Sequence, residues 1–211
     1  MQLTTALKKF ADDSMQRHPG EAQETMKSAI EALKATDILE KAFKTGDMLP
    51  NMTLINAKGQ EVALQDLYSQ ERLVIIFYRG GWCPYCNLEL KAFESVLPQL
   101  KAIGARLVAI GPELPDNSLT TTQKNELSFE VLSDTDNALA AKMNLLYPLP
   151  DDLVQLYSKF GIDLVANQGN QANSLPIAAT YIIEKDGTIS FHFLEEDYKL
   201  RADPETVLAA L

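Results

Sequence analysis

Apolar side chains recur along this chain with two different spacings, and the spacing changes from segment to segment. Near the N-terminus they fall three or four residues apart, as in Leu3, Leu7 and Phe10, and the same spacing returns from Met26 to Leu33. This spacing predicts two amphipathic helices, each with one apolar stripe and one solvated face. Because short helices are marginal alone, both must dock on the core or on a second subunit, and we expect the core.

Two segments further along are almost entirely apolar, with Arg106 at the start of the second. They are Leu73–Tyr78 and Arg106–Ile110, and neither alternates between polar and apolar residues. Such runs predict strands that are covered on both faces of a sheet. After the first strand, apolar residues recur at helical spacing from Leu88 to Ile103, which predicts an amphipathic helix directly downstream.

Turn residues divide the remaining segments into hairpins and helices. One hairpin is predicted around Asn56–Gly59 and a second around Asp186-Gly187, a strong type I′ turn signal. Further elements are expected as helices at 118–127, 138–143 and 151–160, a strand at 129–132, a mobile loop at 167–174, and a terminal helix opened by Asp203-Pro204.

The order of these elements predicts an α/β fold with one central mixed sheet flanked by helices. Parallel crossovers through helices fill its middle, and an antiparallel hairpin closes it. A change of composition at Lys44–Asp47 divides the chain into an N-terminal helical extension, residues 1–44, and a catalytic domain, residues 45–211.

The net charge of the chain and the length of its apolar runs argue against some classes of function. The 211 residues carry a formal net charge of −10, which argues against binding nucleic acid or an anionic membrane through a basic patch. Charged residues interrupt every apolar run in the first 25 residues, and no run approaches the length of a membrane span. We therefore expect a cytoplasmic protein.

The candidate chemistry lies in the only two cysteines, Cys83 and Cys86, at the junction of the first buried strand and its helix. A C-x-x-C pair at this position in a βα pattern is typical of a redox dithiol. The helix N-terminus stabilises a thiolate, and residues three apart in a first turn are close enough to form a disulfide. Open α/β sheets usually hold reactive groups at this end of a central strand.

Three neighbours are expected to support the dithiol. Pro84 favours the first helical turn, Trp82 shields the thiols from water, and Arg79 adds positive charge. No cofactor is expected.

Other interpretations of the two cysteines are weaker. A disulfide that closes so small a loop would stabilise little. A zinc site needs about four ligands, and only His18 and His192, far away in sequence, could join the cysteines. We interpret His192 as an outward strand residue and Glu195–Asp197 as a solvated loop without chemistry.

From residue 45 onward the chain resembles the peroxiredoxin-like proteins of the alkyl hydroperoxide reductase/thiol-specific antioxidant group, within the thioredoxin-fold superfamily. The resemblance lies in four ordered segments: Gly46–Asn51, Gly59–Leu67, Phe77–Cys86 and Tyr181–Gly187. It implies a thioredoxin-like fold, a small hydroperoxide substrate, a thioredoxin or glutathione-type reductant, and a possible homodimer.

The same resemblance assigns roles to single positions. On the family pattern P-x-x-x-T-x-x-C, Cys86 takes the place of the peroxidatic cysteine, Cys83 that of the threonine and Arg79 that of the proline. The arginine of the family falls on Ala178, and a cis-proline of thioredoxin-like relatives would also belong there, whereas Pro176 comes two residues earlier. The arginine and threonine that polarise a peroxide in this family are thus absent from their usual positions.

Three functional hypotheses remain open. The first is a thiol peroxidase in which Cys86 attacks a hydroperoxide and Cys83 resolves the sulfenic acid to a disulfide. The second is a thioredoxin-like thiol–disulfide oxidoreductase in which Cys83 attacks a partner disulfide. The third is a non-enzymatic redox sensor whose N-terminal helices repack when the pair oxidises.

Overall fold

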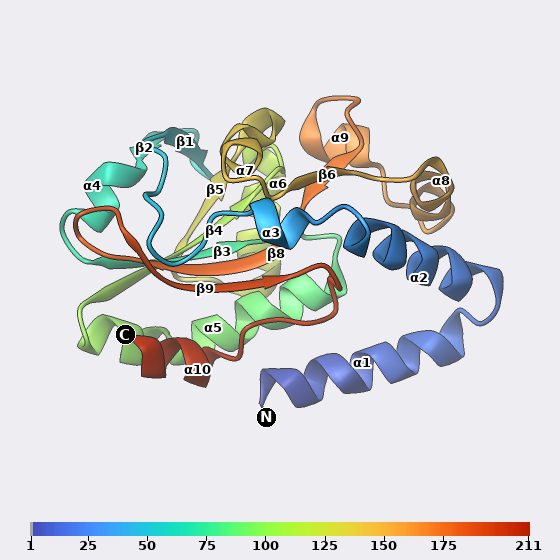
Figure 1. Ribbon diagram of the computed structural model, residues 1–211, viewed down its shortest axis with the longest axis horizontal. Coiled ribbons are helices and arrows are strands. Elements are labelled where there is room, and N and C mark those ends of the chain that lie inside the picture. Colours follow the sequence, from blue (N-terminus) through green and yellow to red (C-terminus); the bar gives the residue numbers. More distant parts are fainter. Residues whose placement is uncertain (1) are drawn as a thin grey trace.

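A central mixed sheet forms the middle layer of the protein (Figure 1). The computed structural model describes residues 2–211. Within them, one seven-stranded sheet has the order β2-β1-β5-β4-β3-β8-β9, and β6 and β7 form a separate pair. The strands are β1 (Thr53–Asn56), β2 (Glu61–Ala63), β3 (Arg72–Phe77), β4 (Ala105–Gly111), β5 (Glu130–Ser133), β6 (Leu146–Pro148), β7 (Ser174–Pro176), β8 (Ala178–Ile183) and β9 (Ile189–Glu195).

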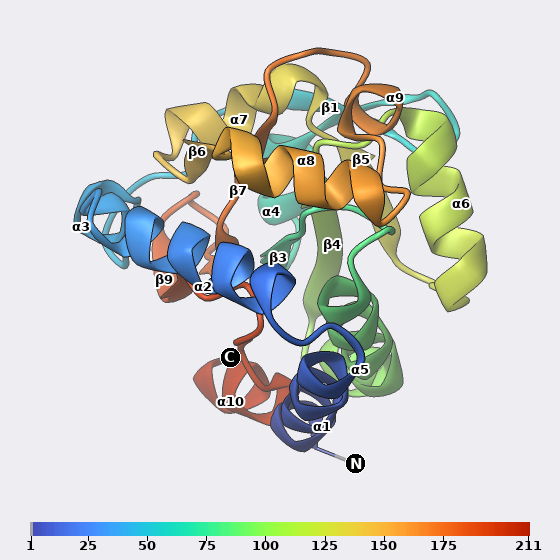
Figure 2. The same ribbon diagram turned by 90° about the vertical axis from the view of Figure 1, so that its right-hand side faces the viewer.

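Helices cover both faces of this sheet (Figures 1 and 2). They are α1 (Leu3–Arg17), α2 (Glu21–Lys34), α3 (Ile38–Lys41), α4 (Leu64–Tyr68), α5 (Pro84–Ala102), α6 (Pro115–Asn125), the 3₁₀ turn η1 (Thr135–Asn137), α7 (Ala138–Lys142), α8 (Asp151–Lys159), α9 (Leu164–Gln168) and α10 (Pro204–Ala210). None of the helices within residues 2–211 is both long and apolar enough to cross a membrane.

The central position of strand β3 explains why nearly all of its side chains are apolar. Strand β3 pairs in parallel with β4 and antiparallel with β8, so neither of its edges is free. Alternate side chains point to opposite faces of a sheet. Leu73 and Ile75 pack on the side of α3, α4 and α7, whereas Val74 and Ile76 pack on the side of α5, and all four are fully buried.

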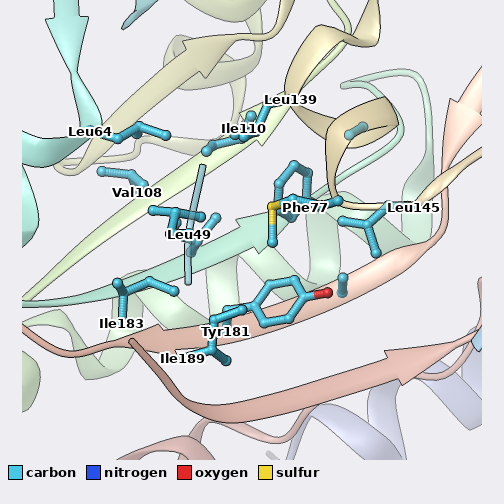
Figure 3. Close-up of a cluster of buried hydrophobic side chains, with 14 of the residues drawn as sticks. Leu49, Leu64, Phe77, Val108, Ile110, Leu139, Leu145, Tyr181, Ile183 and Ile189 are labelled. Atoms are coloured by element: carbon cyan, nitrogen blue, oxygen red, sulfur yellow. The ribbon is translucent and has the colours of Figure 1, made fainter. Parts of the chain in front are cut away.

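Hydrocarbon fills the first of these two faces (Figure 3). Side chains from β3, β4, β8 and β9 meet residues of α4 and α7 there. The labelled set in Figure 3 consists of Leu49, Leu64, Phe77, Val108, Ile110, Leu139, Leu145, Tyr181, Ile183 and Ile189. Its one polar side-chain atom, the Tyr181 hydroxyl, donates a hydrogen bond of 2.9 Å to the carbonyl oxygen of Phe43. The core on this side is therefore almost wholly apolar, and we refer to it as the dry face.

The opposite face of the sheet lies against α5, with α1 and α10 beside it (Figures 1 and 2). Helix α1 buries Leu3 and Leu7 in this layer, while α2 buries Ile30 and Leu33 and lies against α8. The predicted docking of the N-terminal helices on the core is confirmed. The division between residues 1–44 and 45–211 stays a prediction.

Most expected elements are present, and the structure adds α3, α4, β6 and α9, which the sequence analysis did not predict. Both hairpins form, α5 begins at the cysteines, and Asp203 caps α10 by accepting from the amide of Glu205. The prediction of a type I′ turn at Asp186-Gly187 is wrong, because only Gly187 of the two has a positive φ. The prediction of one loop over 167–174 is partly wrong, because α9 extends to Gln168 and β7 begins at Ser174. The side chain of Gln168 is buried and donates to the carbonyl oxygen of Ser174 across 3.2 Å, which ties the two ends of the segment together.

Candidate active site

Cys83 and Cys86 lie where the buried strand β3 gives way to helix α5, as the sequence predicts. Cys83 is the N-cap residue of α5, Pro84 follows at the first helical position, and Cys86 lies in the first turn. The amide of Cys83 donates to the carbonyl oxygen of Gly80 across 3.0 Å, which closes the turn that precedes the helix. Both cysteines are free thiols.

A buried carboxylate holds the loop between β3 and α5 in place. Glu113 accepts hydrogen bonds from the amide of Gly81 (2.9 Å) and from the hydroxyls of Tyr78 (3.0 Å) and Thr121 (2.9 Å). A Cβ atom at Gly81 would lie 2.0 Å from the Thr121 hydroxyl oxygen, so a side chain has no room there. Gly80, with φ at +147°, lies directly under the Trp82 indole. The double glycine thus lets the loop approach these side chains closely.

Arg79 is buried beside the thiols in a cage of aromatic rings. Its guanidinium carbon lies 4.3 Å from the ring centroid of Tyr198, 5.2 Å from that of Trp82 and 5.6 Å from that of Tyr157. One guanidinium nitrogen donates to the Tyr157 hydroxyl, and Nε has no hydrogen-bond partner among residues 2–211. No carboxylate within that range forms an ion pair with this cation.

A second arginine reaches Cys86 from the far end of the chain. Arg201 precedes α10, and its Nε donates to Glu89 Oε2 across 2.7 Å, with both side chains buried. A terminal nitrogen of the same guanidinium lies 3.4 Å from the Cys86 sulfur, which also accepts from the backbone amide of Arg79 at 3.5 Å. Cys86 therefore lies under a buried cation and next to a buried carboxyl.

This environment pushes the pKa values of the two thiols apart. Burial alone would raise the pKa of Cys83, but the hydrogen bond from Cys86 and the charges of Arg79 and Arg201 outweigh it and lower the value to about 6. Burial and the neighbouring Cys83 raise the pKa of Cys86 well above its ordinary value. Near neutral pH the pair thus holds one shared proton and one negative charge, with the charge mainly on Cys83.

The carboxyl of Glu89 is also displaced from its ordinary acidity. Burial raises its pKa to about 8, against the opposing charge of Arg201 and with a further rise from Cys86. Its Oε1 has no hydrogen-bond partner within the described part of the chain. Glu89 can therefore hold a proton close to Cys86 at neutral pH.

A cavity of about 1010 Å³ opens outside Cys83 and does not include Cys86 in its lining. Helices α1 and α2 form one side of it, and Tyr157 of α8 and the segment around Tyr198 form the other. Figure 2 shows α1 and α2 crossing in front of β3 and the start of α5. The cavity places Cys83, rather than Cys86, in the path of an incoming molecule.

The structure brings together every residue that the sequence singled out for the dithiol, and it adds others. Arg79, Trp82 and Cys83 all line the cavity, and Pro84 borders it. Ala178 is buried in β8 and carries no charge, so Arg79 and Arg201 supply the positive charge near the thiols instead. No local pattern in the sequence points to the members contributed from elsewhere, which are Glu89, Glu113, Tyr157, Tyr198 and Arg201.

His18, His192 and the acidic segment Glu195–Asp197 lie in three different environments. His18 packs against Phe160 at 4.8 Å between ring centroids, and Nδ1 of His192 accepts from the amide of Thr45 at 3.1 Å. Among residues 2–211, no group of three or more His, Cys, Asp and Glu side chains is placed to hold a metal ion. The interpretation of Glu195–Asp197 as merely solvated is incomplete, because Glu195 and Asp197 line the cavity.

Comparisons with known proteins agree with this geometry. Residues 45–192, well over half of the chain, match the model of the AhpC/TSA family. The chain belongs to the AhpC/TSA family.

Several curated relatives of this AhpC/TSA chain carry the name peroxiredoxin. The putative peroxiredoxin Rv2521 of Mycobacterium tuberculosis is 26% identical over 144 residues, which cover 68% of this chain and 80% of that protein. Peroxiredoxin Bcp of Escherichia coli is 26% identical over 103 residues, which cover 49% of this chain and 65% of that protein.

Solved structures show the same fold. Peroxidoxin BcpB from Mycobacterium tuberculosis superposes with a TM-score of 0.62 at 19% identity, covering 80% of this chain and 96% of that one. Reduced Prx3 from Vibrio vulnificus, solved in complex with H₂O₂, gives a TM-score of 0.63 at 18% identity, covering 80% and 98% of the two chains. The expected thioredoxin-like, peroxiredoxin-type fold is confirmed, and so is the class of thiol-dependent, peroxidase-type oxidoreductase.

Proposed function

We propose that this protein reduces hydroperoxides with Cys83 as the attacking thiolate and Cys86 as the resolving thiol. The observation that carries the proposal is the position of Cys83, which lines the cavity at the N-cap of α5 beside the otherwise unpaired guanidinium of Arg79. A thiol with a pKa of about 6 is mostly ionised at pH 7, and the thiolate is the reactive species.

The reaction balances with these two sulfurs and a proton. The Cys83 thiolate attacks the terminal peroxide oxygen, the O–O bond breaks, and the leaving alkoxide takes up a proton to become an alcohol or water. Cys83 is thereby oxidised to a sulfenic acid. The Cys86 sulfur then attacks the Cys83 sulfur, hydroxide leaves as water with the Cys86 proton, and a disulfide forms.

The buried arginines take over the electrostatic work that the family assigns to the arginine missing at Ala178. Negative charge builds up on the leaving oxygen as the O–O bond stretches, and a preorganised cation in a dry site stabilises such charge. Arg79 has an unpartnered Nε and lines the cavity next to Cys83. Arg201 donates to Cys86 and so favours the Cys86 thiolate when that sulfur attacks or leaves.

This order reverses the one implied by the family pattern, in which Cys86 attacks first. Cys86 has a raised pKa, is fully buried and does not line the cavity. These properties suit a resolving thiol that reacts only with its neighbour.

Burial also weighs against the alternative of a reductase that acts on protein disulfides. The exposed fraction is 1% for Cys83 and 0% for Cys86, so a disulfide on a protein surface has no direct approach to either sulfur. Thiol–disulfide exchange requires such an approach. A homodimer and a cytoplasmic location remain expectations from the family and the composition.

The test compares Cys83→Ser with Cys86→Ser. We expect Cys83→Ser to lose peroxide consumption entirely, and Cys86→Ser to retain one round of oxidation that stops at a sulfenic acid on Cys83. A sulfenic-acid trap followed by peptide mass spectrometry locates the modified residue. A trapped sulfenic acid on Cys86 in the Cys83→Ser variant would restore the family order and refute ours.

A further inference from the structure

We propose that the Cys83–Cys86 disulfide is reduced by a small thiol that carries carboxylates, of the glutathione type, which enters the cavity between α1, α2 and Tyr198. This inference rests on the proposed dithiol cycle and names its reductant. It distinguishes between two reductants that the sequence leaves open, a small acidic thiol and the protein thioredoxin.

Access is the first argument. A thiolate must reach a disulfide sulfur directly to displace the other sulfur. Cys83 is 1% exposed, and α1 and α2 stand on one side of its cavity with Tyr157 and Tyr198 on the other. A cysteine fixed on the surface of a folded protein cannot pass these walls, whereas the thiol of a tripeptide can. The cavity, at about 1010 Å³, is at the upper end of the range typical of small-molecule sites.

Charge is the second argument. The whole chain carries 19 basic and 29 acidic residues, yet the balance in the cavity lining is reversed. Its basic members are Lys8, Arg17, Lys27, Arg79, Lys199 and Arg201, and its acidic members are Glu195 and Asp197. A positive cavity in a negative protein concentrates small anions at its mouth.

Several of these cations lack a carboxylate partner. Lys199 pairs with Asp197 at 3.4 Å and Arg201 pairs with Glu89. By contrast, Lys8, Arg17 and Lys27 form no ion pair within residues 2–211. They come from α1 and α2, so the N-terminal helices supply the charge that a carboxylate-bearing thiol would meet.

The exchange balances with two molecules of the small thiol. The first thiolate attacks the Cys83 sulfur, the Cys83–Cys86 bond breaks, and Cys86 leaves as a thiolate under the guanidinium of Arg201, 3.4 Å from its sulfur in the reduced protein. The second thiolate attacks the outer sulfur of the mixed disulfide and releases Cys83 as a thiolate. The dithiol is restored, and the two small thiols leave as their disulfide.

The experiment starts from full-length protein whose disulfide is formed with diamide, so it does not depend on any reaction with peroxide. Reduction is followed by acid quenching, alkylation of free thiols and intact mass measurement. The probes are glutathione, glutathione diethyl ester, which has the same thiol with both carboxylates capped, and thioredoxin. Rates are expressed per thiolate, because the two forms of glutathione differ in thiol acidity.

A combined Lys8→Gln, Arg17→Gln and Lys27→Gln variant tests the charge. Its matched control carries Lys58→Gln, Lys142→Gln and Lys185→Gln, at exposed lysines outside the cavity lining. We expect glutathione to react about tenfold faster than its diester at low salt, and the ratio to fall about threefold or more in the cavity variant. The control variant should keep the ratio of the unmodified protein.

Two results would overturn the inference. The first is faster reduction by thioredoxin than by glutathione at equal concentration, and the second is a glutathione-to-diester ratio that the cavity charges do not change. A failure of the proposed function would give a different result. In that case hydroperoxide would not oxidise the reduced protein, but glutathione would still reduce the disulfide formed with diamide.

Discussion

One face of the central sheet is filled by hydrocarbon from β3, β4, β8, α4 and α7, whereas the other, beneath α5, holds buried charges beside the thiols. On the first face the Tyr181 hydroxyl, the one polar side-chain atom of the set labelled in Figure 3, is hydrogen-bonded. On the second face, Nε of Arg79 and Oε1 of Glu89 are buried without partners in residues 2–211. An unsatisfied buried polar atom costs about 1–3 kcal/mol.

The two faces therefore contribute differently to the stability of the fold and to the chemistry of the thiols. Close-packed hydrocarbon stabilises the fold, since burying apolar surface is the dominant favourable contribution to folding. The buried charges and unpaired polar atoms of the other face destabilise the fold, but the charges lower the pKa of Cys83. Substitutions on the dry face should therefore lower stability without changing thiol chemistry. Substitutions on the face that holds the thiols should change the acidity of Cys83 or the pH dependence of stability.

The largest expected effect is the loss of stability in Leu139→Ala. Leu139 is fully buried in the dry face, and removing its side chain should lower the free energy of unfolding by about 2–5 kcal/mol. Urea denaturation measures the loss. Leu119→Ala, at a half-exposed position on α6, should change stability by less than about 0.5 kcal/mol. A displaced titration of Cys83 in Leu139→Ala would contradict the separation of the two faces.

A smaller effect is expected from Glu89→Gln, and it depends on pH. Burial raises the pKa of Glu89 from 4.5 to about 8, so its stabilising contribution is fully present below pH 4.5 and is lost as pH rises towards 8. The variant lacks this titration. Its free energy of unfolding, relative to the unmodified protein, should therefore rise by about 1–3 kcal/mol between pH 5 and 8. Parallel stability curves over this range would exclude a titrating Glu89.

The smallest effect in energy is on the reactivity of Cys83 in Arg79→Met. Removing the guanidinium should raise the pKa of Cys83 from about 6 by about 1, because an opposite charge nearby favours the thiolate. Alkylation by iodoacetamide increases with pH through the thiol pKa, so the profile should move to higher pH and the rate at pH 6 should fall about fivefold.

Arg106→Met is the matched control for this experiment. Arg106 lies on β4, pairs with Glu71 at 3.9 Å and takes no part in the cavity around Cys83. Its removal should leave the alkylation profile in place. Equal profiles for Arg79→Met and the unmodified protein would show that Arg79 does not acidify Cys83, and that the hydrogen bond from Cys86 and the charge of Arg201 lower its pKa without it.

The sequence predicted the parts of the site that one continuous segment provides. The apolar run of β3, the double glycine and the cysteines at a helix start are local signals, and they position Arg79, Trp82 and Pro84 as well. Arg201 could not be predicted in this way, because 115 residues separate it from Cys86 and its neighbours form no motif of their own.

The remaining partners depend on tertiary packing in the same manner. Tyr157 is the aromatic residue of α8, and nothing in that helix marks it as functional; only the packing of the helix brings its hydroxyl to Arg79. The order of attack was also out of reach. Both cysteines are equally near the helix start, and only the position of α1 and α2 distinguishes the sulfur that meets the cavity.

Trp82, the single tryptophan of the chain, gives the protein an intrinsic optical reporter. Its indole lies against the guanidinium of Arg79, borders the ring of Tyr157 and immediately precedes Cys83. Loss of the sulfur's negative charge on oxidation alters the field around this one chromophore. We therefore expect the fluorescence emission of Trp82 to change when the pair oxidises, which would report the redox state without an attached dye.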